Sequence, residues 1–385
     1  MKTKKILLFN DTSEDNNPGC KSTVHGLNKQ FKKTDYVIRI SKGFGYNYFY
    51  NCYTNPFDKK GPIIRRFFNI FKKINYLISN SSKIHKHQDN NVPKISLKLW
   101  FRALNKVQSR ERKLIELLQS CDEVVINMEG TIHHNSVGAL TLLGIAYLGK
   151  KYNKKTVLVN GSIQSMDQRL LNIVLSNLDK ISVREVYSLR YLNSLGINSQ
   201  QAADCAFLTD INTPFDFSDR IKYLCKDACL FSPGILASRY KKSKKYLDYL
   251  RHFLMQLKKK NQKIVYFRVD NGEGQELILL ANNLNIPIIY ASEIPWLSIG
   301  SFLKQVSCLI SGRYHLLIFA LMSQVPIVPI SSNSWKIEGL LDLIGDSDLK
   351  VLDIYADTMK AKEIMAARLD LDLAKMQKLA LKNYS

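Results

Sequence analysis

Short runs of apolar residues alternate with longer amphipathic stretches along most of the chain. Ile6–Phe9 and Thr156–Val159 are typical of buried strands, whereas Ser136–Lys151 has the length and spacing of a helix. Strands that alternate with helices indicate βαβ units and a parallel sheet. The alternation runs twice, and Asn212–Ser218, which has the turn residues of a linker, separates the two series. We therefore expect an α/β fold with two doubly wound, Rossmann-like domains facing a cleft.

The first series predicts an N-terminal α/β domain over residues 1–212. Its expected strands are Ile6–Phe9, Tyr36–Ile40, Glu123–Asn127, Thr156–Val159, Ile181–Val183 and Ala202–Asp204. Its expected helices are a segment capped by Ser22 and ending near Lys32, then Arg110–Gln119, Ser136–Lys151, a segment ending near Leu178, and Val186–Leu195.

The second series predicts a C-terminal α/β domain over residues 213–385. Its expected strands are Ala228–Phe231, Ile264–Val269, Ile286–Tyr290, Cys308–Ser311 and Ile327–Ile330. Its expected helices are Lys244–Lys260, Gln275–Asn283, Ser298–Val306, Leu316–Met322, Trp335–Leu343 and Met359–Leu381. The last of these helices is a candidate to pack back on the first domain.

A basic, aromatic insert at about residues 42–110 interrupts the first series. Ser41–Tyr53 is rich in Gly and aromatic residues, which suggests an ordered loop over a ligand. Arg65–Asn80 has apolar residues at helical spacing, and Lys94–Lys106 continues the basic, apolar pattern around Trp100. Two interpretations are open: a pair of helices on a membrane surface, or an amphipathic helix packed on its own domain with solvated lysines.

Charge is concentrated in the same region. The formal net charge of the chain is +23, and Asp58–Lys113 contains 15 Lys and Arg against 3 Asp and Glu, a local net charge of +12. Such a segment attracts polyanions, among them nucleic acid, anionic lipid and phosphorylated substrates. The seven cysteines are scattered and odd in number, which favours a reducing compartment over a disulfide framework. The apolar part of the N-terminus is shorter than the about 7–15 residues of a signal peptide, so we expect a cytoplasmic protein.

Several polar residues follow predicted strands of the first domain. Asn127, Glu129 and Gly130 come at the end of a buried strand, where Gly130 permits close approach of a ligand to the backbone. Glu129 is either a general base or the cap of the next helix. Arg184 follows another strand, either in a surface ion pair with Glu185 or directed at a carboxylate or phosphate.

The chemistry of the second domain centres on two loops that follow predicted strands. Arg313 and His315 come after the strand Cys308–Ser311, and Ser331–Lys336 comes after Ile327–Ile330. Loops at the carboxyl ends of parallel strands face the ligand crevice. Two cations, an imidazole and a helix N-terminus therefore predict an anion site.

The same residues resemble the motifs of the polysaccharide pyruvyl transferases. The motifs are Ile126–His134, Ser182–Glu185, Ala203-Asp204, and Ser311–His315 with Ser331–Lys336, in matching order and spacing over about residues 1–345. The resemblance implies a GT-B-like fold, with phosphoenolpyruvate bound between the domains. Met128 departs from the family pattern because a glycine often occupies that position, and the basic insert matches no motif.

The resemblance also implies roles for individual residues. The donor site would consist of Arg184, Arg313, His315, Ser332, Asn333 and Lys336. Glu129 would deprotonate the acceptor hydroxyl, and His315 would be either the proton donor or a phosphate ligand. The expected acceptor-binding residues are Asn10, Asp11, Asn127 and Gly130.

The expected reaction needs neither a metal nor a cofactor, because the cationic residues neutralise phosphoenolpyruvate, which is the donor substrate. The expected partners are phosphoenolpyruvate, a glycan or lipid-linked glycan acceptor, and no nucleic acid. Binding of residues 58–113 to anionic lipid would place the protein at the inner face of the plasma membrane. Two alternatives are a glycosyltransferase, in which Arg313 and Lys336 hold the diphosphate of a nucleotide sugar and Glu338 its ribose, and a non-catalytic binder of polyanions.

Overall fold

The computed structural model describes residues 3–41, 43–50, 52, 92, 94–234, 244–270, 273–345, 349, 351–352 and 371–384. The helix predicted over Arg65–Asn80 and most of the one predicted over Met359–Leu381 lie outside these residues. The chain divides into two compact units. Unit 1 contains the described residues of Met1–Thr12, Asn28–Asp204 and Leu381–Ser385, and unit 2 those of Ser13–Leu27 and Cys205–Ala380. The predicted division at residue 212 stays a prediction.

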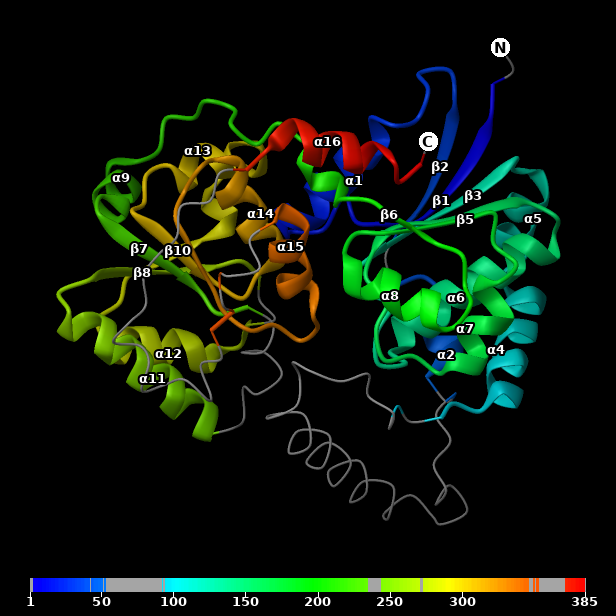
Figure 1. Ribbon diagram of the computed structural model, residues 1–385, viewed down its shortest axis with the longest axis horizontal. Helices are drawn as coiled ribbons and strands as arrows, with labels where there is room; N and C mark the ends of the chain where they lie inside the picture. Colours follow the sequence, from blue (N-terminus) through cyan, green and yellow to red (C-terminus); the bar gives the residue numbers. More distant parts are fainter. Residues whose placement is uncertain are drawn as a thin grey trace. The chain divides into compact units, whose positions relative to one another are not determined.

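Unit 1 is built on a parallel sheet of six strands in the order β2-β1-β3-β4-β5-β6 (Figure 1). The strands are β1 (Lys5–Asp11), β2 (Tyr36–Ser41), β3 (Glu123–Glu129), β4 (Lys155–Gly161), β5 (Lys180–Val183) and β6 (Gln200–Gln201). Every residue of β3 is buried, as expected for a central strand of a parallel sheet that is covered on both faces.

Helices α6 and α4 form successive layers beside this sheet. The helices of unit 1 are α2 (Tyr46–Phe49), α4 (Leu97–Arg110), α5 (Arg112–Ser120), α6 (Val137–Lys151), α7 (Gln168–Leu175) and α8 (Val186–Ser194). Helix α6 is apolar on nearly all sides and packs on β3 and β4. Phe49 of α2 and Leu104 of α4 lie against Gly144 of α6, so α6 is enclosed.

Unit 2 contains a parallel sheet of five strands in the order β11-β10-β7-β8-β9. The strands are β7 (Ala228–Ser232), β8 (Lys263–Arg268), β9 (Ile288–Tyr290), β10 (Cys308–Ser311) and β11 (Ile327–Pro329). The helices of this unit are α1 (Pro18–Asn28), α9 (Asp219–Cys225), α11 (Lys244–Lys259), α12 (Gln275–Asn283), α13 (Ile299–Leu303), α14 (Tyr314–Met322), α15 (Lys336–Ile344) and α16 (Leu373–Leu381), with the last residues of α1 and α16 in unit 1.

Alternate residues of the second sheet face different helices. Phe231 and Tyr266 pack with α11 and α12 on one face. Phe267, on the other face, contacts Phe302 of α13 at a ring-centroid distance of 5.1 Å. Figure 1 shows α11 and α12 on one side of this sheet and α13 and α14 on the other. This period of two confirms that the strands are buried on both faces.

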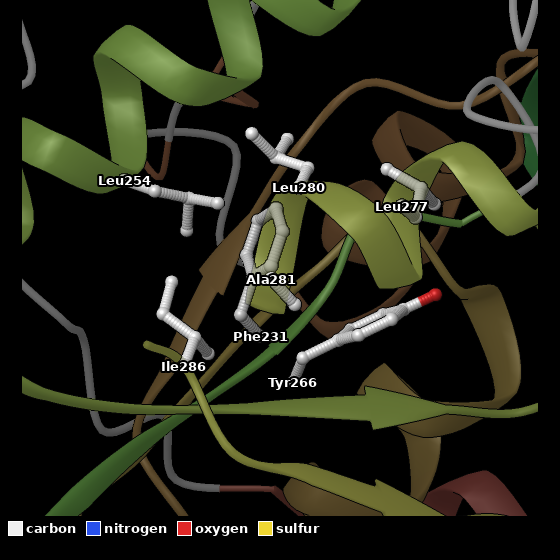
Figure 2. A pocket seen from close by; sticks show the side chains of 7 residues that line it. All are labelled: Phe231, Leu254, Tyr266, Leu277, Leu280, Ala281 and Ile286. Carbon is white, nitrogen blue, oxygen red and sulfur yellow. The ribbon is translucent and has the colours of Figure 1, made fainter. Parts of the chain in front are cut away.

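A small apolar cavity lies in the core between α11, α12 and the sheet (Figure 2). The space open to the centre of a water molecule is about 10 Å³. The lining residues are Phe231, Leu254, Tyr266, Leu277, Leu280, Ala281 and Ile286. An apolar space of this size holds at most one water and offers it few polar partners. It is a packing gap in the core.

Two local predictions were wrong, and one helix, α9, was not predicted. Ser22 lies inside α1, where its hydroxyl donates to the carbonyl of Gly19, because the helix begins earlier, at Pro18. Residues 202–204 form no strand, and β6 is Gln200–Gln201. Helix α9 follows the linker and is capped by Ser218, whose hydroxyl accepts from the Ile221 amide.

Within the basic insert, α4 is a core-facing helix. Trp100, Ala103, Leu104 and Val107 of α4 are buried, and the indole Nε1 of Trp100 donates to the Leu140 carbonyl at 3.1 Å. The apolar face of α4 is thus occupied by its own unit. Among the described residues, no helix is long and apolar enough to cross a membrane.

Candidate functional site

Each sheet has one point at which the strand order reverses direction. In unit 1 the chain leaves β1 for β2 on one side and then places β3 on the other side of β1. Asn10 near the end of β1 and Glu129 at the end of β3 flank this point. In unit 2 the corresponding neighbours are β7 and β10, which end at Ser232 and Ser311. Ligands of open parallel sheets bind beside such points, at the carboxyl ends of the strands.

Buried asparagines link three adjacent strands of unit 1 at this edge. The Asn10 Nδ2 donates to the Asn127 carbonyl at 2.7 Å, and the Asn127 Nδ2 donates to the Asn10 carbonyl at 3.3 Å. The Asn160 Nδ2 donates to Asn127 Oδ1 at 3.4 Å, and the Asn160 amide donates to Asn383 Oδ1 at 2.9 Å. Asn10 and Asn127, predicted to bind the acceptor, therefore brace the sheet. The Asn10 Oδ1 is buried and has no hydrogen-bond partner among the described residues.

The ends of the same three strands adopt left-handed backbone conformations. The φ angles are 59° at Asn10, 46° at Glu129 and 59° at Asn160. Asparagine tolerates this conformation well, but a glutamate with positive φ carries strain on the order of 1–3 kcal/mol. The strain is concentrated at the residue predicted to be the general base, and Glu129 is largely buried, with 8% exposure.

Arg184 lies beside Gly130 and forms a buried ion pair with Asp204. A Cβ atom at Gly130 would be 3.6 Å from Arg184 Nη2. The Arg184 Nη1 donates to Asp204 Oδ2 at 2.7 Å, with side-chain exposures of 1% and 0%, and its Nε donates to the Ser162 hydroxyl at 3.2 Å. The charge of the predicted donor ligand is thus balanced by a carboxylate whose role the sequence left open.

The neighbouring charged residues have structural partners. Glu185, next to Arg184 in the chain, caps α8 by accepting from the Ser188 amide. Asp11, predicted to bind the acceptor, forms a 3.4 Å ion pair with Arg39 of β2. The open question about the Arg184-Glu185 dipeptide is therefore answered for Glu185, which is a helix cap.

Arg313, at the N-cap of α14, is held by two carboxylates. Its Nη1 donates to Asp270 Oδ2 at 2.8 Å and its Nη2 donates to Glu273 Oε1. The Tyr266 hydroxyl donates to Glu273 Oε2 at 2.5 Å. The Glu273 side chain is 0% exposed and that of Arg313 is 11% exposed. The Arg313 Nε has no hydrogen-bond partner within the described part of the chain.

Burial governs the titration of this cluster. Desolvation raises the pKa of Glu273 above its usual value, although the nearby charge of Arg313 opposes the shift. Burial, followed by the Glu273 charge, raises the pKa of the Tyr266 phenol as well. Two carboxylates, of which Glu273 is buried and Asp270 is 32% exposed, surround one guanidinium and leave an excess negative charge. The raised pKa of Glu273 shows that the cluster favours a proton.

His315 is fixed by helix α1. Its Nε2 lies 3.2 Å from the Thr23 hydroxyl, and the donor of this hydrogen bond depends on the imidazole tautomer. A Cβ atom at Gly19 would be 2.3 Å from the His315 Nδ1 and 2.4 Å from its Cβ. Only glycine therefore fits at position 19 with the imidazole in this place. Sequence reasoning missed Gly19 and Thr23.

The loops after β7, β10 and β11 meet at the same edge of the second sheet. A Cβ atom at Gly312 would be 2.7 Å from the Pro233 carbonyl oxygen and 3.1 Å from that of Ser331. Gly312 thus permits the close approach of three backbone segments.

Lys336 is joined to the loop after β11. Its Nζ donates to Asn333 Oδ1 at 3.0 Å, and the Ser332 hydroxyl donates to the same oxygen at 3.3 Å. Arg313, His315 and Lys336 share one edge of the sheet, but these hydrogen bonds lead them to different neighbours. Among the described residues, no three His, Cys, Asp or Glu side chains form a group that holds a metal ion.

Solved structures of other proteins have a similar fold. UDP-GlcNAc 2-epimerase from Methanocaldococcus jannaschii, in complex with UDP-GlcNAc and UDP, has a TM-score of 0.55 at 14% identity, covering 96% of this chain and 94% of that chain. S. aureus MnaA with UDP has a TM-score of 0.58 at 13% identity, covering 100% of this chain and 93% of that chain. OtsA has a TM-score of 0.51 at 12% identity, covering 99% of this chain and 96% of that chain. At these identities they show the fold alone, and they confirm the predicted GT-B-like α/β architecture with two parallel sheets.

The sequence itself shows the family. Comparison with curated proteins gives no match. The family model described as polysaccharide pyruvyl transferase matches residues 20–334, which is more than half of the chain. The match includes Glu129, Arg184, Arg313 and His315, whereas Lys336 lies just beyond it. The chain therefore belongs to the polysaccharide pyruvyl transferase family and is a transferase.

Proposed function

We propose that the protein transfers the enolpyruvyl group of phosphoenolpyruvate to sugar hydroxyls of a cell-surface polysaccharide or its lipid-linked precursor. The products are a pyruvate ketal and phosphate. The family implies a pyruvyl donor and a polysaccharide acceptor. The observation that carries the proposal is the position of Arg313, His315 and Lys336, which follow β10 and β11 at the carboxyl edge of the second sheet.

The reaction balances without a further reactant. A proton is added to the methylene carbon of phosphoenolpyruvate, and the adjacent carbon becomes cationic. One sugar hydroxyl adds to that carbon, and a second hydroxyl then displaces phosphate. Of the two hydroxyl protons, one replaces the proton used at the methylene carbon and the other leaves with phosphate. The protein must therefore hold an anion, supply a proton and accept one.

The described residues suit these tasks in the following way. Lys336, held by Asn333, supplies positive charge for the donor carboxylate or phosphate. His315, held by Thr23, carries the proton to the methylene carbon or contacts the phosphate. Glu129 accepts the proton of the sugar hydroxyl from its strained position at the end of β3. Gly130 leaves the neighbouring backbone open to the acceptor.

Carboxylate side chains hold both arginines in place. Arg184 is balanced by Asp204, and we assign its guanidinium to orienting the anionic donor. The guanidinium of Arg313 retains an Nε donor without a partner among the described residues. A proton on Glu273 would remove the excess negative charge beside Arg313 and favour the arrival of an anionic donor.

A phosphate-release assay tests the proposal. The purified protein is incubated with phosphoenolpyruvate and surface glycan prepared from cells that lack the protein, and the glycan is analysed by mass spectrometry. We expect phosphate release that depends on the glycan, together with a pyruvate ketal on the sugar. Nucleotide sugars are assayed in parallel because the epimerase and MnaA structures named above contain UDP compounds. Turnover of a nucleotide sugar without any ketal would favour the glycosyltransferase alternative.

The expected cytoplasmic location remains a prediction. All seven cysteines are buried and free. Fractionation of cells that express the full chain would test the location, with activity towards phosphoenolpyruvate measured in the soluble and membrane fractions.

A further inference from the structure

Helix α4 presents a row of exposed cations. Lys98, Arg102, Lys106 and Arg110 are each four residues apart, and all four are exposed. Residues at this interval are neighbours on a helix surface, so the row extends over about 18 Å. Like charges at this spacing destabilise a helix. The row therefore needs a reason other than helix stability.

The packing of α4 does not supply that reason. The opposite face is held by buried Trp100, Ala103, Leu104 and Val107, and Trp100 contacts Phe49 at a ring-centroid distance of 6.4 Å. The buried contacts are apolar and would form equally well with neutral residues on the outer face. The cations are thus displayed on a rigid helix whose other side is already occupied.

Some other cations of unit 1 have acidic partners. Lys4 and Lys155 both pair with Glu123, and Lys150 pairs with Asp179. Within the described residues, no ion pair includes a member of the row on α4. The surrounding segment, Lys94–Ser120, contains 7 Lys and Arg (Lys94, Lys98, Arg102, Lys106, Arg110, Arg112 and Lys113) against 2 acidic residues (Glu111 and Glu116). Its positive field is therefore largely uncompensated.

We propose that the row Lys98, Arg102, Lys106 and Arg110 binds the anionic headgroups of a lipid bilayer. Leu97 and Phe101, beside the first two cations, are only partly buried, and an aromatic or aliphatic side chain next to a cation suits the headgroup region. Because the main apolar face of α4 is occupied, the attraction is chiefly electrostatic. Each cation near an anionic surface strengthens binding by roughly fivefold.

This surface goes beyond the transfer reaction and does not depend on the donor. If the acceptor is lipid-linked, the surface brings the enzyme to the layer in which the acceptor resides. None of the four residues belongs to the proposed donor or acceptor sites. Loss of membrane binding and loss of transfer chemistry are therefore separable by experiment.

The test uses vesicle flotation with the full chain. The variant is Lys98→Gln, Arg102→Gln, Lys106→Gln and Arg110→Gln together. The control is Lys226→Gln, Arg251→Gln, Lys259→Gln and Lys304→Gln, which changes the net charge equally at exposed positions of unit 2. Glutamine keeps a high helix propensity, and removal of the like charges should leave α4 as stable or more stable. Vesicles contain phosphatidylcholine alone or mixed with phosphatidylglycerol.

We expect the wild type and the control to bind only the mixed vesicles, and the α4 variant, which lacks four cations, to bind them about 600-fold more weakly. Raising the ionic strength to about 1 M should release the wild type, since the Debye length falls to about 3 Å. Glycan-dependent phosphate release without vesicles should be unchanged in the α4 variant. Equal weakening in both variants, no binding to the mixed vesicles, or row-dependent binding to an oligonucleotide instead of vesicles would each overturn the proposal.

Discussion

Arg184 in unit 1 and Arg313 in unit 2 are placed alike but balanced differently. Each follows a short buried strand, β5 or β10, and each is largely buried. The Arg184 guanidinium pairs with the Asp204 carboxylate, whereas that of Arg313 pairs with both Asp270 and Glu273. The Arg184–Asp204 pair combines one positive with one negative charge. The cluster around Arg313 has two carboxylates for one guanidinium, and protonation of a carboxylate would remove the excess negative charge.

Because its ion pair has one positive and one negative charge, Arg184 has a structural role that does not depend on titration. Removing a partner from a buried pair leaves an isolated charge, which is costly at every pH near neutrality. Removing one of two carboxylates from the second cluster leaves Arg313 still paired. We therefore expect substitutions in the first cluster to affect folding most, and substitutions in the second to affect pH dependence and catalysis.

The largest expected effect is that of Asp204→Ala. It removes the carboxylate that pairs with the buried Arg184 guanidinium, so the free energy of unfolding should fall by about 3–5 kcal/mol. Chemical denaturation measures the loss. The double substitution Arg184→Met with Asp204→Leu removes both charges and should be markedly more stable than the single variant. Equal instability of the two variants would show that the pair is not the source of the effect.

The next largest effect is expected at Gly19, which lies beside His315, and it should exceed that at Gly130, which lies beside Arg184. Gly19→Ala places a Cβ atom 2.3 Å from the His315 Nδ1, whereas at Gly130 the nearest atom, Arg184 Nη2, is 3.6 Å away. Gly19→Ala should cost about 1–3 kcal/mol of stability and displace the imidazole, so turnover falls. Gly130→Ala should leave the unfolding free energy nearly unchanged and raise the KM for the glycan acceptor. Since the His315 Cβ itself is 2.4 Å from the added Cβ, the clash should be relieved only when that atom is removed, as in Gly19→Ala with His315→Gly, and turnover should not recover.

The third prediction concerns how the unfolding free energy depends on pH through Glu273, the buried partner of Arg313. Since burial raises the pKa of Glu273, its contribution to stability is fully present below the ordinary glutamate pKa of 4.5 and is lost as pH rises through the raised value. Glu273→Gln removes this dependence. Its unfolding free energy should therefore improve relative to that of the wild type as pH increases over that window.

The control for this experiment is Glu276→Gln in α12. Subtracting its stability curve removes whatever follows from losing any one carboxylate of this region. A stability difference between wild type and Glu273→Gln that does not change with pH, or that changes in the opposite sense, would contradict a protonated Glu273.

The smallest expected effect concerns the cavity behind Tyr266. Tyr266 lines this cavity (Figure 2). Its hydroxyl donates to Glu273. Ala281→Val adds methyl groups at the cavity wall and should stabilise unit 2 by about 0.5–1 kcal/mol if the added volume fits. Differential scanning calorimetry measures the gain. A loss of stability would show that the wall cannot accommodate the added methyl groups.

The sequence predicted the architecture well because periodicity reports directly on burial. Apolar runs such as Glu123–Asn127 correspond to observed strands, and Gln275–Asn283 was predicted with its observed bounds. Ser136 was correctly predicted at the start of α6. The error at Ser22 arose because the stronger signal, Pro18 as the first helical residue after Asn17, was overlooked.

The contacts of the site were less accessible to sequence reasoning. The pairing of Arg184 with Asp204 depends on the adjacency of β5 and the segment after β6, which pattern alone does not reveal. The sequence does contain one indication of this pair, because Arg184 and Asp204, with opposite charges, each follow a short apolar segment. Asp270 and Glu273 reach Arg313 from the loop after β8, although they precede it in the chain by 43 and 40 residues. Such long-range charge pairs follow from the strand order.

The most direct test of the proposed reaction compares phosphate release with ketal formation in the wild type and in His315→Ala. The wild type should release one phosphate from phosphoenolpyruvate for each pyruvate ketal formed on the glycan, and His315→Ala should lose turnover by about 100-fold or more while remaining folded. Phosphate release without ketal, no reaction of the wild type with any surface glycan, or full activity of His315→Ala would contradict the account.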